Sequence, residues 1–82
     1  MNLFDVEKLK KKGDLDGLLG ALEDRDQYVR RNAASALCTF CDPGVAEVLA
    51  RLKFSDPSQE VRNTASRGHA TVVAALKGKK TR

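Results

Sequence analysis

A short motif that occurs twice in fixed register constrains the fold of this chain more than any other feature. Two segments, 24–33 and 56–65, carry identical residues at five positions, at a constant offset of 32 residues. The matched pairs are Asp24 and Asp56, Gln27 and Gln59, Val29 and Val61, Arg30 and Arg62, and Ala33 and Ala65. A repeat of this period within 82 residues indicates a stack of similar structural units.

Apolar residues at helical spacing accompany each copy of the motif. In front of the two copies, stripes offset by 30 residues each predict one face of a short amphipathic helix. These stripes are Leu15, Leu18, Leu19 and Leu22, and Val45, Val48, Leu49 and Leu52. Two longer stripes predict the helices that carry the motif: Val29, Ala33, Ala36, Leu37 and Phe40, and Val61, Ala65, Gly68, Val72, Ala75 and Leu76. No strand-length window alternates β-branched and polar residues, so we expect no strand.

Capping signals set the expected ends of these helices. Segments 24–27 and 56–59 pair an aspartate with a glutamine three residues later, which predicts capping boxes. Asp42-Pro43 and Asp56-Pro57 are typical of an N-cap followed by a proline in the first turn. Gly13, after a run of lysines, predicts the end of a first helix. The expected helices are at about 4–12, 14–22, 25–41, 43–53 and 57–77.

These five helices predict a single all-α domain over residues 1–77, in which a leading helix precedes two helix pairs at about 14–41 and 43–77. Residues 78–82 are predicted to form a basic disordered tail. A helix pair cannot bury its apolar face alone, so stacking must supply the core. Because repeat proteins usually need about three repeats for stability, self-association through an uncapped end is an open alternative.

The positive charge is concentrated at the two ends of the chain. The net charge is +4, yet residues 13–76 hold seven basic and nine acidic side chains, a net of −2. Lysine-rich ends of this kind are more typical of solvated termini than of a nucleic-acid footprint. No apolar run approaches the ~20 residues that span a bilayer, and no signal-peptide layout precedes the first helix. We therefore expect a cytoplasmic protein without a membrane partner.

The chemically reactive side chains do not assemble a recognisable catalytic or metal site. Cys38 and Cys41 fall near the end of a helix, where the helix dipole disfavours a thiolate. A zinc site needs four ligands, and His69 is the only other candidate. We interpret the cysteines as buried or half-buried reduced thiols and His69 as part of the packing at a helix end. Without paired carboxylates or a phosphate-binding loop, we expect no enzyme activity, no cofactor and no metal.

The repeated pattern D-x-x-x-x-V-R-x-x-A-x-x-A-L, preceded by an apolar helix, resembles HEAT-like repeats, specifically the short type of phycobilisome lyases and many small scaffold proteins. It runs from Asp24 to Leu37 and from Asp56 to His69. The resemblance implies a short right-handed α-α superhelix. It also implies a ladder in which turn aspartates and the arginines after them tie neighbouring repeats together, with Asp24, Arg30, Asp56 and Arg62 as its members.

One departure from the pattern concerns the end of the stack. The second repeat has Gly68 and His69 where the first has Ala36 and Leu37. A polar residue at a core-type position indicates that nothing stacks beyond the last helix.

HEAT-like scaffolds bind many partners, so the resemblance supports several functional hypotheses. The first is a protein or peptide bound on a concave face that is lined by the longer helices. Small and polar residues are predicted to form this face: Arg31, Asn32, Ser35, Thr39, Asn63, Ser66, Arg67 and Ala70. The second is a nucleic acid held by Arg31, Arg67 and the basic ends. The acidic body and an expected lack of exposed aromatic side chains for base stacking argue against it. A lyase-like role is a third hypothesis.

Overall fold

A computed structural model describes the backbone of residues 1–80 and the side chains of residues 1–78. Its helices are α1 (Leu3–Lys12), α2 (Leu15–Ala21), α3 (Gln27–Leu37), α4 (Pro43–Ser55) and α5 (Gln59–Lys80), and the described residues contain no strand. The all-α prediction is therefore confirmed. None of the described helices is both long and apolar enough to cross a bilayer.

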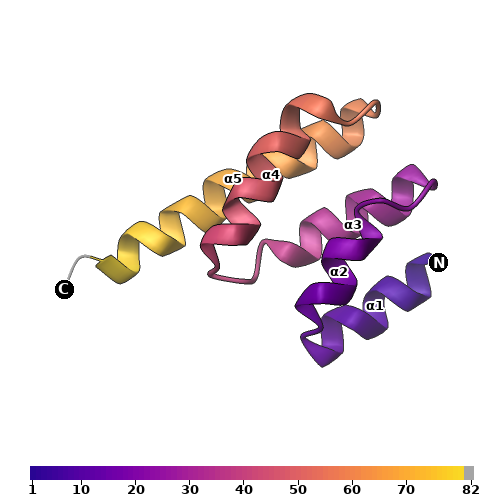
Figure 1. Ribbon diagram of the computed structural model, residues 1–82, viewed down its shortest axis with the longest axis horizontal. Coiled ribbons are helices and arrows are strands. Elements are labelled where there is room, and N and C mark those ends of the chain that lie inside the picture. Colours follow the sequence, from indigo (N-terminus) through magenta and orange to yellow (C-terminus); the bar gives the residue numbers. More distant parts are fainter. Residues whose placement is uncertain (81–82) are drawn as a thin grey trace.

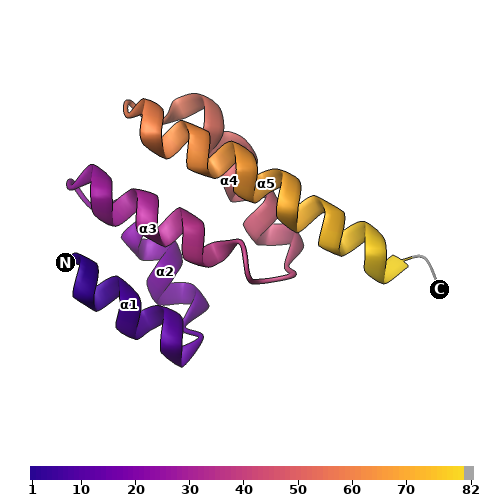
Figure 2. The same ribbon diagram turned by 180° about the vertical axis from the view of Figure 1, so that it is seen from behind.

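The helices form two layers. α1, α3 and α5 lie side by side in one layer (Figure 2), and α2 and α4 form the other (Figure 1). The resulting slab measures 40 × 28 × 14 Å, so its short dimension holds only two helices. Each helix of the first layer contacts the next, and α4 makes its most extensive contact with α5. The layer of α1, α3 and α5 is called the long-helix layer below.

Local sequence determines where α1 and α4 begin and end. Asn2 caps α1 in a reciprocal capping box with Asp5, and Gly13 ends the helix in the left-handed conformation, at φ 68°. Asp42 caps α4 by accepting hydrogen bonds from the amides of Gly44 and Val45, and Pro43 occupies the first helical position. The predictions for Gly13 and for Asp42-Pro43 are thus confirmed.

The predicted capping boxes of α3 and α5 are wrong. Asp24 and Asp56 each accept a hydrogen bond from the amide two residues later, from Asp26 at 3.0 Å and from Ser58 at 2.8 Å. Each aspartate thereby closes a turn in the loop, and the helix starts after that turn. Asp26 is the N-cap of α3, and Pro57 lies in the turn before α5 rather than in its first helical turn.

Two helices differ in length from the prediction at their C-terminal ends. α3 ends at Leu37 rather than near residue 41, because the next residues form tighter three-residue turns, with Phe40 donating to the Leu37 carbonyl at 3.1 Å. Residues just before a proline are also biased away from helical backbone angles. α5 continues to Lys80, so residues 78–80 of the predicted tail are helical, and residues 81–82 lie outside the described part of the chain.

The apolar stripes form one continuous core between the two layers. Its largest fully buried side chains are Leu18, Val29, Leu37, Val45, Leu49, Val61 and Val72. Leu19, Val48 and Leu52 pack against this core but are only half-buried, and Ala75 is exposed. α1 contributes Val6 to the core, so the leading helix covers the first repeat.

Candidate functional site

An arginine of the first repeat binds the aspartate in the turn of the second repeat. Arg30 donates from Nε to Oδ2 of Asp56 at 2.8 Å and from Nη2 to Oδ1 at 3.1 Å. Its Nη1 also donates to the carbonyl of Asp24 at 2.8 Å and to that of Arg25 at 3.1 Å. Asp56 is the one charged residue that is buried among those described, at 6% exposure. This bidentate contact joins the two repeats along one edge of the stack.

The six-residue spacing between each turn aspartate and its arginine lets the arginine bind the backbone carbonyl of that aspartate. Arg62 donates from Nη1 to the carbonyl of Asp56 at 2.7 Å, as Arg30 does to the carbonyl of Asp24. Within a repeat, the arginine therefore binds the backbone carbonyl of the turn aspartate. The carboxylate of that aspartate binds other residues. The Asp24 carboxylate accepts from the Asp26 amide and lies 3.5 Å from the Met1 ammonium.

Both turn aspartates are held in their ionised form. Burial alone would raise the pKa of Asp56, but the hydrogen bonds from Arg30 and from the Ser58 amide outweigh it and lower the pKa. The pKa of Asp24 is lowered chiefly by the hydrogen bond from the Asp26 amide. The junction between the repeats therefore depends on a negative charge at Asp56.

On α3 and just after it, three of the four predicted binding residues, Arg31, Asn32 and Thr39, already have side-chain partners within the chain. Arg31 donates to Glu60 on α5 at 3.2 Å and to the Asn32 side chain at 3.3 Å, and its guanidinium lies 5.4 Å from the centre of the Tyr28 ring. Asn32 and Ser35 line a polar hollow of about 190 Å³ against Glu7, Lys10 and Val6 of α1. Thr39 is exposed, and its hydroxyl donates to the Ala36 carbonyl at 2.9 Å. α1 is therefore part of this face, which the repeat pattern alone did not indicate.

On α5, the predicted residues divide between two surfaces. Asn63, Ser66, Arg67 and Ala70 are all exposed. At the repeat offset, Ser66 and Ala70 correspond to Ala34 and Cys38, which lie on the side of α3 that meets α5 at Gly68. Ser66 and Ala70 therefore face away from α3, toward the end of the stack. Asn63 and Arg67 stay on the outer surface of the long-helix layer, beside the residues of α3.

The cysteines and the histidine do not form a site. Cys38 is half-buried and donates to the Ala34 carbonyl at 3.3 Å, and its burial raises the pKa of the thiol. Cys41 is exposed, so the expectation that both thiols are at least half-buried is wrong for this residue, which lies in the loop after α3. His69 Nδ1 lies 3.2 Å from Nζ of Lys53 on α4. The described residues hold no group of three or more His, Cys, Asp or Glu side chains that could bind a metal ion.

Three aromatic side chains are exposed, contrary to the expectation from the sequence. Phe4 is 68% exposed, Tyr28 51% and Phe54 80%. Phe54 lies near the end of α4, after the apolar stripe that ends at Leu52. Each ring carries a cationic neighbour within 5.4 Å of its centre, namely Lys8, Arg31 and Lys53 respectively. A slab two helices thick buries only one face of each helix, so aromatic residues off that face stay in solvent.

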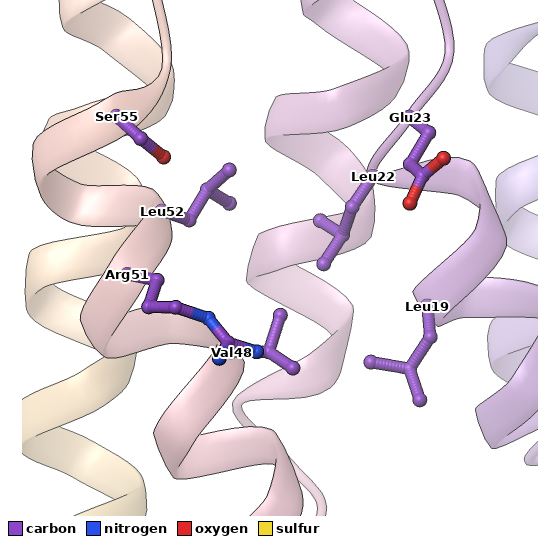
Figure 3. A pocket seen from close by; sticks show the side chains of 7 residues that line it. All are labelled: Leu19, Leu22, Glu23, Val48, Arg51, Leu52 and Ser55. Atoms are coloured by element: carbon purple, nitrogen blue, oxygen red, sulfur yellow. The ribbon is translucent and has the colours of Figure 1, made fainter.

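An apolar groove separates the two helices of the other layer (Figure 3). Its volume is about 330 Å³, and it is lined by Leu19, Leu22 and Glu23 from α2 and its end, and by Val48, Arg51, Leu52 and Ser55 from α4. The sequence stripes placed these three leucines and Val48 in the core. The stripes do not reveal the groove. They indicate which face of each helix is apolar, but not whether the apolar faces of α2 and α4 contact each other.

With the geometry in place, the family of the chain is clear from comparison with known proteins. The sequence model for HEAT repeats matches residues 15–77, which covers α2 to α5 except for the last turn. The chain belongs to the HEAT-repeat family. HEAT repeats commonly mediate protein–protein interactions. The match does not single out the phycobilisome-lyase type. No curated protein and no solved structure was found to match the chain.

Proposed function

We propose that this HEAT-repeat protein is a non-catalytic scaffold that binds a protein or peptide on the outer surface of its long-helix layer. The observation that carries the proposal is Arg67. Its side chain is exposed and makes no hydrogen bond or ion pair with the described residues, whereas Arg31 on the same surface is held by Glu60. Asn63 lies one turn earlier on α5 and is also exposed. An arginine and an amide free to donate are suited to a peptide carboxylate and its backbone.

The surroundings of Arg67 indicate the kind of partner. The hollow between α1 and α3 adds Lys10, Glu7 and the small polar Ser35, and the Arg31–Glu60 pair is neutral overall. The surface therefore offers mixed polar contacts with one uncompensated positive charge. We infer that the ligand is an extended or helical peptide with an acidic residue placed to meet Arg67.

The test uses peptides selected from a random library for binding to the full chain. Replacing Arg67 by Ala should lower the affinity for the selected peptides about tenfold or more, since a central arginine often contributes most of the binding energy of a surface. Arg51→Ala is the matched control, because Arg51 is an exposed arginine on α4 that lines the groove of the opposite layer. The affinity of the Arg51→Ala variant for the peptides should stay within about twofold of that of the parent chain. If Arg51→Ala weakens binding and Arg67→Ala does not, the ligand occupies the groove and the proposal fails.

Nucleic-acid binding through Arg31, Arg67 and the basic ends is the alternative function. The exposed rings of Phe4 and Tyr28 supply the stacking groups that the sequence did not lead us to expect. Arg31, however, is engaged by Glu60, and residues 13–76 carry a net charge of −2. These two observations favour the protein or peptide ligand. The dependence of affinity on salt separates the alternatives, because binding to a phosphate backbone weakens steeply as salt is added.

A further inference from the structure

Arg62 makes the same contact with a backbone carbonyl as Arg30 does, but it forms no ion pair with the described residues. Each arginine donates from Nη1 to the carbonyl of its own turn aspartate, at 2.8 Å for Arg30 and 2.7 Å for Arg62. Arg30 then uses Nε and Nη2 to hold the carboxylate of Asp56 in the following repeat. In the described part of the chain no further repeat packs against Arg62, and its Nε and Nη2 donate to no residue there. The half-buried guanidinium is therefore held in place with its carboxylate-binding edge open.

The surface around Arg62 corresponds to a covered surface in the first repeat. On α3, Ala34 and Leu37 are fully buried, and the Ala34 carbonyl lies close to Gly68 of the second repeat. At the repeat offset, their counterparts on α5 are Ser66, which is exposed, and His69, which is half-buried. Next to them lies the exposed Ala70. Arg62, Ser66, His69 and Ala70 are called the end face below, and its small side chains would let a helix approach closely.

We propose that the end face docks a second helical protein, which presents an aspartate in the turn directly before one of its helices. The chain itself contains the template for this contact. The Asp56 carboxylate accepts from the Ser58 amide, which orients it toward Arg30, and α5 then leaves the turn and packs along α3. Arg62 offers the same donors to a partner turn of the same kind, and the pair of opposite charges would be shielded from solvent on docking. This surface is distinct from that of Arg67.

A second copy of the chain fits the end face less well than a different helical protein. The Asp56 carboxylate of a second copy is already occupied by Arg30 and the Ser58 amide. Its Asp24 carboxylate is engaged by the Asp26 amide and by the Met1 ammonium. Neither turn aspartate is available without breaking contacts within the second copy. The partner is therefore inferred to carry a turn aspartate whose carboxylate no arginine of a preceding repeat holds.

The test is a titration of the isotope-labelled full chain with a synthetic peptide that copies residues 55–77, the turn and helix of the template. The Nε–H resonance of Arg62 should move on addition of the peptide, while that of Arg30 should stay in place. A peptide with Asp56→Asn should bind at least about tenfold more weakly, because it removes the carboxylate alone. Arg62→Lys in the chain should have a similar effect, since lysine keeps the charge but loses the two-pronged geometry. Arg51→Lys, at an exposed arginine that lines the groove of the opposite layer, is the matched control and should leave the affinity unchanged.

Several outcomes would overturn the proposal. One is the absence of binding at about 1 mM peptide, near the weak limit of ordinary affinities. Others are equal binding of the Asp56→Asn peptide, or movement of the Arg30 resonance, which would mean that the peptide displaces the native α5. The Asp56→Asn comparison leaves the chain unaltered, so it stands even if Arg62→Lys fails to fold. If sedimentation reveals dimers of the chain alone that Arg62→Lys dissociates, the occupant is a second copy and the inference of a different partner is wrong.

Discussion

At the scale of single residues, the contact between Arg30 and Asp56 is expected to contribute most to the stability of the junction. The side chains are 12% and 4% exposed, and the two hydrogen bonds between them are charge-assisted. Arg30→Ala would leave the Asp56 carboxylate buried with only the Ser58 amide as a partner. We expect the free energy of unfolding to fall by about 1–3 kcal/mol, measured by urea denaturation at neutral pH.

Arg31 provides the matched control for this prediction, because it is the adjacent arginine on the same helix. Its ion pair with Glu60 is far more open to solvent, with side-chain exposures of 34% and 66%. Screening by water limits such a pair to less than about 1 kcal/mol, so Arg31→Ala should have the smaller effect. A larger loss of stability for Arg31→Ala would mean that the register of the junction described above is incorrect.

The lowered pKa of Asp56 predicts how stability depends on pH. A carboxyl group whose pKa is lower in the folded state adds stability above its unfolded pKa, about 4, and loses it as the pH falls through the folded value. The free energy of unfolding should therefore decrease in acid below about pH 4. The Asp56→Asn variant should be less stable at pH 7 and should show a smaller decrease in acid. An equally steep decrease in the variant would assign the acid sensitivity to other carboxylates, of which Asp24 is the first candidate.

At the scale of helices, the sequence predicted which segments are helical better than it predicted where they begin. The apolar stripes identify α2 to α5 because helical spacing indicates which side of each helix packs on the core, and Gly13 marks the end of α1. The starts of α3 and α5 were misplaced because an aspartate two or three residues before a helix can close a turn or cap the helix. Asp24 and Asp56 do the first, and only their hydrogen bonds distinguish the two roles. The end of α3 depends on Phe40 packing against the core, which is a tertiary contact.

Gly68 marks the closest approach of α5 to α3, which leads to a prediction for that helix pair. A Cβ atom at this position would lie 2.5 Å from Sγ of Cys38 and 3.3 Å from Cδ1 of Leu49. Gly68→Ala should therefore destabilise the fold by about 1–3 kcal/mol, although alanine favours a helix over glycine. Thermal unfolding of Gly68→Ala and of the Gly68→Ala/Cys38→Ala double variant tests this, since removal of the sulfur should recover much of the loss.

The control for this prediction is Gly20 in α2, where an added Cβ would meet no atom within 4 Å. Gly20→Ala should stabilise the chain by about 0.5–1 kcal/mol, because only the helix preference of alanine applies. Stabilisation by both substitutions would contradict the close packing of α5 on α3. The close contact at Gly68 also explains part of the departure of the second repeat from the pattern, in which the first repeat has Ala36. Only glycine fits at position 68 without displacing its neighbours.

At the scale of the whole molecule, the two functional hypotheses differ in their response to salt and to loss of the basic end. Binding to a phosphate backbone weakens with salt at a slope of about 0.9 per phosphate contacted. We expect only weak binding of the chain to nucleic acid, and removal of residues 78–82 should abolish it. Arg31→Ala and Arg67→Ala should barely alter that binding, because the body of the chain is acidic. Affinity measured by fluorescence anisotropy across a range of salt concentrations tests the prediction.

The opposite result would favour the nucleic-acid function. Tight binding that survives loss of residues 78–82 and keeps a steep salt slope would require a phosphate-binding surface on the helices themselves. A peptide ligand should tolerate the truncation and lose affinity with Arg67→Ala. The sequence alone could not decide between these surfaces, because it does not reveal that Glu60 engages Arg31 or that Ser66 and Ala70 face the end of the stack.

The unequal contact within the two layers has a mechanical consequence. α3 and α5 pack closely at Gly68, while the groove keeps α2 and α4 largely apart. The slab should therefore bend about the α3–α5 seam as a hinge, so that a change of curvature widens or narrows the distance between α2 and α4. Spin labels on Glu23 and Arg51 would report this bending as a broad distribution of distances. Labels on Ser35 and Arg67, close to the seam, would give a narrow one, and tension applied along the stack would be taken up first by the layer of α2 and α4.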